Sequence, residues 1–252
     1  MSSKCAASAA MPSTLAKIVV REHGENCFME SAYRNIGYFL LALPLIFVAG
    51  FWIPYLSAIP HFDPSITVPV HLHAFLLFAW IVLLVIQPLS IRRGAFKLHR
   101  VFGRVSYGLM PLIVVSAVAM IHKEYHEHLA SGMRSGAALA AEFLSVSQLA
   151  LLGIFYCSAV IHIKRREVAA HMRYMICIAL VLLPAGLART FGYWFDVRQS
   201  TSQTYCLAII DLCLIGLIWF DRTRHLVARP YIQALSAYII IEASWVALGR
   251  PV

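Results

Sequence analysis

The stretch from Val70 to Ile91 constrains the fold of this chain more than any other. It reads VHLHAFLLFAWIVLLVIQPLSI and contains no Asp, Glu, Lys or Arg. About twenty such residues in a helix cross the roughly 30 Å hydrocarbon core of a bilayer. A basic segment, RRGAFKLHR, follows at once. The pattern is typical of a transmembrane helix that ends at a positively charged loop.

Composition extends this interpretation to the whole chain. Hydrophobic residues make up 60% of the sequence and charged residues 13%, whereas about 25% of the residues of an average soluble domain are charged. We therefore expect an all-α polytopic membrane helix bundle with about seven transmembrane helices. The expected spans are Asn35 to Leu56, Val70 to Ser90, His99 to Ile121, Ala137 to Ile163, His171 to Gly192, Thr204 to Phe220 and Tyr231 to Leu248.

Lys and Arg concentrate in alternate connections of this scheme. Because cytoplasmic loops retain such residues, the N-terminus is predicted to be cytoplasmic. We expect residues 1–32 to form a short cytoplasmic tail and residues 33–252 a single transmembrane helical domain. The net charge of +9 is spread over short juxtamembrane loops, so the expected partner is the lipid bilayer and not a nucleic acid.

Four ionisable residues fall in the outer half of the expected spans: Glu142, Arg189, Asp211 and Glu242. Such groups in lipid usually face the bundle interior and a partner. We therefore expect a polar cavity open toward the outside, with Arg189 as the counter-ion of Asp211 or Glu142. The cavity can be a binding site or proton pathway, or the four residues can be a structural ion-pair network.

Histidines also gather at the outer rim. His71 and His73 form an H-x-H pair, and His122 and His126 are four residues apart on one helical face. Imidazoles at this density can bind Zn or Cu, which makes these four residues candidate metal ligands. The alternative is that they are solvated loop histidines.

A polar stripe on the second expected span consists of His73, Trp80 and Gln87, which recur every seven residues. Residues at this spacing lie on one face of a helix. The stripe can face a cofactor or a cavity. It can equally be a packing face whose polar atoms bond neighbouring helices.

A second histidine pair is expected at the cytoplasmic rim. His99 opens the third span and His171 opens the fifth, so both lie at the same depth on the same side. Two imidazoles at one level can hold a b-type haem between them, with Arg100 and Arg173 available for the propionates. Gly103 lies on the face of His99 and would allow a flat macrocycle, or another helix, to approach closely.

The combination H-x-H, Trp, Q-P, L-H-R-x-x-G-R-x-S-Y and H-M-R-Y-M resembles an uncharacterised family of bacterial multi-pass membrane proteins. The motifs lie within His71 to Val114 and His171 to Arg189. The resemblance implies a multi-pass protein of the bacterial cytoplasmic (inner) membrane and carries no known activity.

More distantly, the arrangement looks like the di-haem transmembrane cytochromes b. That resemblance implies that His99 and His171 are one axial pair. A second pair is missing, because His73 has no histidine partner inside the fourth span. At most one haem is therefore expected.

Two classes of function follow from these observations, and a third possibility is that the protein only assembles with a larger complex. The first is one-electron transfer or quinone-linked redox chemistry through a haem b, with a quinone or a redox protein as partner. The second is a non-redox carrier or sensor that binds a small solute, proton or metal in the outward-facing cavity. The sequence leaves open whether the protein is an enzyme. It contains no nucleotide-binding loop, zinc-protease motif or nucleophile elbow.

Overall fold

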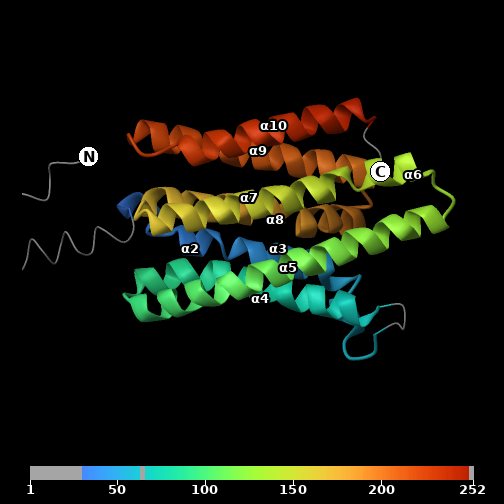
Figure 1. Cartoon of the computed structure of the whole chain (residues 1–252), viewed down its shortest axis with the longest axis horizontal. Coiled ribbons are helices and arrows are strands. Elements are labelled where there is room, and N and C mark those ends of the chain that lie inside the picture. The colour runs from blue at the N-terminus through green and yellow to red at the C-terminus, as the bar shows by residue number, and fades with distance from the viewer. Residues whose placement is uncertain (1–29, 63–65, 250–252) are drawn as a thin grey trace, which may run out of the picture.

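The computed structural model describes residues 30–62 and 66–249, and this part of the chain is helical, without strands. The expected tail lies outside the described residues except for its last three positions. The main helices run side by side along one long axis (Figure 1). They are α2 (Ile36–Phe39), α3 (Ala42–Trp52), α4 (Val68–Arg92), α5 (Phe96–Ala130), α6 (Ser135–Ala141), α7 (Phe143–Lys164), α8 (Val168–Phe195), α9 (Gln199–Thr223) and α10 (Arg229–Ala247), with short 3-10 turns at η1 (Ser31–Tyr33) and η2 (Leu56–Ala58).

The expectation of an all-α polytopic bundle is confirmed. Six helical segments are long and apolar enough to cross a membrane: Ser31–Trp52, Val68–Arg92, Phe96–Ala130, Phe143–Lys164, Val168–Phe195 and Gln199–Thr223. The seventh expected span corresponds to α10, which has 19 residues and is not among these six. It lies against α9 and α8 as a member of the bundle (Figure 1).

The three most basic connections, α4 to α5, α7 to α8 and α9 to α10, lie at the left end of the bundle in Figure 1. We call this the basic end. Tight turns there place Gly94, Arg166 and His225 at φ values of 72°, 60° and 56°. One-sided clustering of Lys and Arg is the distribution that the positive-inside rule describes.

Helix α8 is the centre of the bundle. It contacts α3, α4, α7, α9 and α10. Its contact with α3 is close, because a Cβ atom added to Gly50 would lie 2.1 Å from the backbone oxygen of Gly186. Small residues allow such backbone-to-backbone packing between membrane helices. Around this centre, Phe39, Leu45 and other large apolar side chains remain exposed on the outside of the bundle, as expected for lipid-facing positions.

The expected fourth span, Ala137 to Ile163, is interrupted. Helix α6 ends at Ala141 and α7 begins at Phe143, which places Glu142 at the junction. Helix α5 has 35 residues and extends about 52 Å at 1.5 Å per residue, longer than the hydrocarbon core. Its C-terminal part and α6 project past the neighbouring helices at the end opposite the basic loops (Figure 1). We call this the opposite end.

Candidate functional site

The interior between α4, α5, α7 and α8 contains the expected haem ligand His171. This residue lies one turn into α8, and its Nδ1 donates a hydrogen bond of 2.9 Å to the backbone oxygen of Ala159 in α7. A bond of this kind fixes the ring and makes Nδ1 the protonated nitrogen. The lone pair of the ring is therefore on Nε2, which is the atom that can bind a metal.

His99 lies at the same end, in the first turn of α5. Its ring is close to the backbone of Gln87 in α4, and His171 is near enough for the two imidazoles to interact electrostatically. Its Nδ1 is buried and has no hydrogen-bond partner. The structure thus brings the two predicted ligands to one level from two different helices, and each ring keeps an unpaired nitrogen.

The stripe on α4 faces this interior. His73 Nδ1 lies 3.0 Å from Ser116 Oγ on α5. The ring of Trp80 meets that of Tyr156 on α7 edge to face, at 5.7 Å between centroids, and Gln87 is the nearest neighbour of Gly103. All three stripe residues therefore point toward α5 and α7, as their spacing predicts.

Two of these stripe residues carry unpaired polar atoms. Trp80 Nε1 and Gln87 Oε1 are buried without a hydrogen-bond partner. Buried polar groups in native proteins are nearly always paired, and each exception needs an explanation. With the unpaired nitrogen of His99 on α5, they are three unsatisfied groups in the interior between α4, α5 and α7. We call Trp80, Gln87, His99 and His171 the interior site.

The interior site fits a bis-imidazole haem in its donor set. Two imidazoles offer free nitrogens, and one of them is oriented by a backbone carbonyl. A Cβ added at Gly103 would have one neighbouring atom within 4 Å, Gln87 Nε2 at 3.8 Å. Arg100 is exposed one residue after His99 and remains available for an anionic group.

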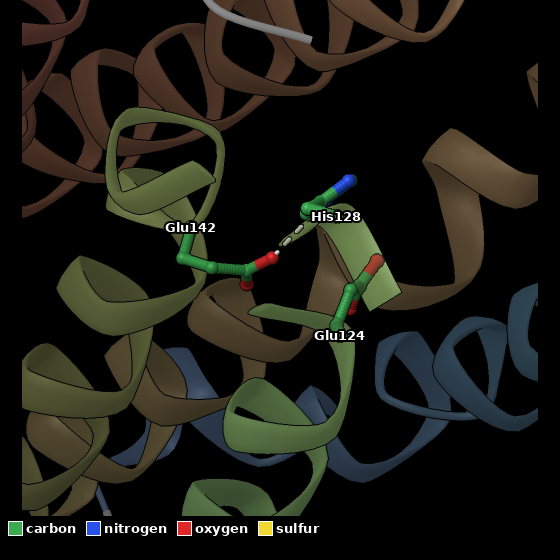
Figure 2. Close-up of side chains that lie close together, drawn as sticks. All are labelled: Glu124, His128 and Glu142. Atoms are coloured by element: carbon green, nitrogen blue, oxygen red, sulfur yellow. Dashed lines mark ion pairs between the residues drawn. The ribbon is translucent and has the colours of Figure 1, made fainter. Parts of the chain in front are cut away.

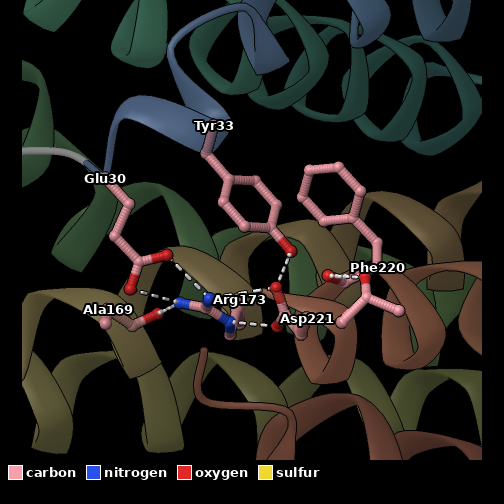
Figure 3. Close-up of polar contacts among 7 residues, drawn as sticks. Glu30, Tyr33, Ala169, Arg173, Phe220 and Asp221 are labelled. Atoms are coloured by element: carbon pink, nitrogen blue, oxygen red, sulfur yellow. Dashed lines mark hydrogen bonds and ion pairs between the residues drawn. The ribbon is translucent and has the colours of Figure 1, made fainter. Parts of the chain in front are cut away.

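Arg173 differs from this expectation, because its guanidinium is fully used elsewhere (Figure 3). It donates to Asp221 at 2.6 and 3.1 Å, to Glu30 at 2.7 and 3.3 Å, and to the backbone oxygen of Ala169 at 2.9 Å. These bonds employ all five guanidinium N–H donors. Arg173 is therefore committed to two carboxylates and has no donor left for a propionate.

Sequence reasoning missed the partners of Arg173. Asp221 is fully buried, and Tyr33 donates a hydrogen bond of 2.7 Å to its Oδ1. The guanidinium also lies 4.9 Å from the centroid of the Tyr33 ring. We call Glu30, Tyr33, Arg173 and Asp221 the paired network. Asp221 directly follows Phe220, the last residue of the expected span Thr204 to Phe220, so that span did not include it.

The four predicted metal ligands do not form one site. His122 and His126 do meet, with 3.1 Å between their Nε2 atoms. His71 instead bonds the hydroxyl of Tyr55, at 2.7 Å, and His73 bonds Ser116. The predicted set therefore separates into one exposed pair and two histidines with other partners.

The residues of the predicted polar cavity also separate. Asp211 and Glu242 interact with each other across α9 and α10. Arg189 donates to the backbone oxygen of Ala185 at 2.8 Å and lies over the ring of Phe51. Within the described residues it forms no ion pair with Asp211 or Glu142, so the expected counter-ion role of Arg189 is not observed.

Glu142 has a different partner from the one expected. Its Oε1 lies 3.4 Å from His128 Nε2, and Glu124 is on the same side of α5 as His128 (Figure 2). Burial raises the pKa of Glu142 above its ordinary value; the charge of Glu124 adds to the rise and that of His128 opposes it. Among the described residues, Glu124, His128 and Glu142 form a cluster of potential metal ligands whose ligand atoms all lie within 4.8 Å of one another.

The chain matches no protein-family model, and it shows no significant similarity to curated proteins or to solved structures. Its function must therefore be inferred from its own residues.

Proposed function

We propose that the protein is a membrane-embedded electron carrier that holds one b-type haem between His99 and His171. The observation that carries the proposal is the pair of imidazoles at the interior site. His171 is oriented by the carbonyl of Ala159, and the buried Nδ1 of His99 has no partner. A haem iron with two imidazole ligands supplies reversible one-electron transfer.

The chain's own residues have separate tasks in this proposal. His171, held by Ala159 O, presents Nε2 in a fixed direction, and such outer hydrogen bonds tune metal ligands. The rings of Trp80 and Tyr156, which meet edge to face, would form an aromatic wall of the haem site, and the Tyr156 hydroxyl lies 3.0 Å from Ser106 Oγ. The unpaired Gln87 Oε1 and Trp80 Nε1 are available to polar groups of a ligand, and their apolar surroundings exclude water.

The proposed electron donor is a quinol, which dissolves in the bilayer around the helix bundle, or a redox protein. One electron leaves the reduced donor and later passes to an acceptor of higher potential. Arg100, exposed near His99, would supply positive charge for a propionate. The setting proposed is the bacterial cytoplasmic membrane with the basic end inside, in agreement with the distribution of Lys and Arg.

The test is a reduced-minus-oxidised visible spectrum of detergent-purified protein produced with a haem precursor. The proposal expects a sharp b-type band at close to one haem per chain. His99→Ala and His171→Ala should each abolish the band. His162→Ala is the matched control, because His162 lies at the same end but is paired with Glu167 and stacked on Tyr174.

Two outcomes would overturn the proposal. One is a featureless spectrum from well-folded protein, and the other is retention of the band in the double variant His99→Ala/His171→Ala. The alternative is a non-redox carrier or sensor of a small solute, proton or metal. The observation that favours it is the Glu124, His128 and Glu142 cluster, which is independent of the interior site.

A further inference from the structure

The opposite end of the bundle contains a second constellation of ligating groups. Glu124 and His128 are one helical turn apart on α5, and Glu142 faces them from the junction of α6 and α7 (Figure 2). One ligand atom from each residue lies within 4.8 Å of the other two. Three side chains from two chain segments thus converge on one point.

The spacing of the closest pair is that of ligands on a common ion. His128 Nε2 and Glu142 Oε1 are 3.4 Å apart, whereas a charge-assisted hydrogen bond between such groups measures about 2.7–2.9 Å. Two ligands bound at about 2.0–2.1 Å in a tetrahedral site are separated by about 3.4 Å. The pair is therefore too far apart for a good hydrogen bond and well placed for coordination.

Burial distinguishes this cluster from a group of surface charges. The Glu142 side chain is 5% exposed and that of His128 is 32% exposed, while Glu124 is exposed. A carboxylate this buried is stabilised by a positive charge beside it, and a bound cation between the three side chains supplies one. One ligand is thus held inside the fold, while His128 is partly exposed and Glu124 is exposed.

We propose that Glu124, His128 and Glu142 bind a divalent transition-metal ion such as Zn²⁺ or Mn²⁺. One imidazole and two carboxylates form a mixed nitrogen and oxygen set, which suits these ions better than Ca²⁺ or Mg²⁺, whose sites consist of oxygen ligands. Three protein ligands leave at least one coordination position for water or a substrate. The site is separate from the interior site, which lies at the other end of the bundle.

The surrounding charges set the expected strength of binding. Arg189 on α8 is near enough to Glu124 for their charges to interact, and a fixed cation at that position weakens the binding of a second one. Lys123 is engaged with Glu127 at 2.6 Å. The exposed His122 and His126 pair on the same helix is a competing place for an added metal, so the experiment must separate the two.

The experiment is a calorimetric titration of the detergent-solubilised full chain, freed of metal by a chelator, with Zn²⁺ and with Mn²⁺. We expect one ion per chain at the proposed site. Glu124→Gln, His128→Gln and Glu142→Gln should each weaken its binding about tenfold or more, the size of effect known for groups that support metal ligands. Thermal unfolding with and without the ion gives a second readout, because a bound ion stabilises the folded state.

Two control variants make the result specific. Glu127→Gln removes a carboxylate of the same helix that is not part of the cluster, and His122→Gln/His126→Gln removes the competing pair; both should retain the site. Absence of binding, or binding that depends only on His122 and His126, would overturn the proposal. If Glu142→Gln does not fold, Glu124→Gln, at an exposed position, still tests whether the cluster binds the ion. Haem is not involved in any of these measurements.

Discussion

Helix α8 carries two polar regions at nearly the same depth that differ in how completely their groups are paired. His171 and Arg173 are two residues apart, so their side chains leave the helix in nearly opposite directions. Arg173 enters the paired network, where all its donors bond Asp221, Glu30 or Ala169. His171 enters the interior site, where nearby groups on α4 and α5 have unpaired buried atoms.

This difference separates a structural role from a binding role. A buried polar network in which every group is paired holds helices in place, and removing one member leaves charges without partners. Buried groups without hydrogen-bond partners destabilise the folded chain, so their presence is expected where a bound ligand pairs with them. The paired network should therefore govern stability, and the interior site should govern ligand binding with little effect on folding.

The largest effect is expected from Arg173→Leu. It leaves Asp221 fully buried without its cation, and breaking a buried ion pair in this way typically costs about 3–5 kcal/mol. The measurement is the free energy of unfolding in detergent, relative to the exposed neighbour variant Arg222→Leu, which should remain within about 0.5 kcal/mol of wild type. A loss below about 1 kcal/mol for Arg173→Leu would remove the contrast between the two regions.

Tyr33→Phe tests the same network with a smaller change. The ring and its contact with the Arg173 guanidinium remain, while the hydrogen bond of 2.7 Å to Asp221 Oδ1 is lost. Hydrogen bonds to charged groups contribute about 1.5–3 kcal/mol, so the free energy of unfolding should fall by that amount. Tyr38→Phe is the matched control, since Tyr38 is exposed; equal effects of the two variants would contradict the role of Tyr33.

Much of the fold could be predicted from the sequence, because bilayer thickness sets the length of an apolar helix. Most expected spans coincide with one helix, although Asn35 to Leu56 is divided among α2, α3 and η2 and Ala137 to Ile163 between α6 and α7. His99 and His171 occur at one level because both begin helices at the basic end. The break at Glu142 was not predictable in the same way. The residues before it, SGAALAA, are mostly alanine, which favours helix, so helix propensity gives no signal of the break.

The side-chain contacts within the interior site, the paired network and the metal cluster were harder to predict than the depth of these residues in the bundle. His122 and His126, like Glu124 and His128, are one turn apart on α5. Which pair faces Glu142 depends on the rotation of α5 and on the α5 to α6 turn, which no periodicity specifies. Similarly, helical spacing places His171 and Arg173 on different faces of α8, but it does not show that Glu30 and Asp221 approach only one of them.

His171→Leu should separate stability from binding. It removes the hydrogen bond to Ala159 O, and a single neutral bond contributes about 0.5–1.5 kcal/mol. The loss in unfolding free energy should therefore be less than half of that for Arg173→Leu, while the b-type absorbance of the haem-loaded protein disappears. Unfolding of the haem-free proteins and the visible spectrum of the haem-loaded proteins check the two statements separately. Equal losses of unfolding free energy for His171→Leu and Arg173→Leu would show that His171 also serves mainly to stabilise the fold.

Gln87→Leu is expected to produce the smallest effect, and in the opposite direction. Gln87 Oε1 is buried and unpaired, and leucine of similar size removes this unsatisfied acceptor. Leaving such a group unpaired costs about 1–3 kcal/mol, so the ligand-free protein should gain about 1 kcal/mol in unfolding free energy. The same variant should bind haem more weakly, which a titration of the ligand-free protein measures. If Gln87→Leu stabilises the ligand-free protein and also weakens haem binding, then Gln87 serves binding and not stability. A loss of stability with unchanged haem affinity would instead assign Gln87 to packing.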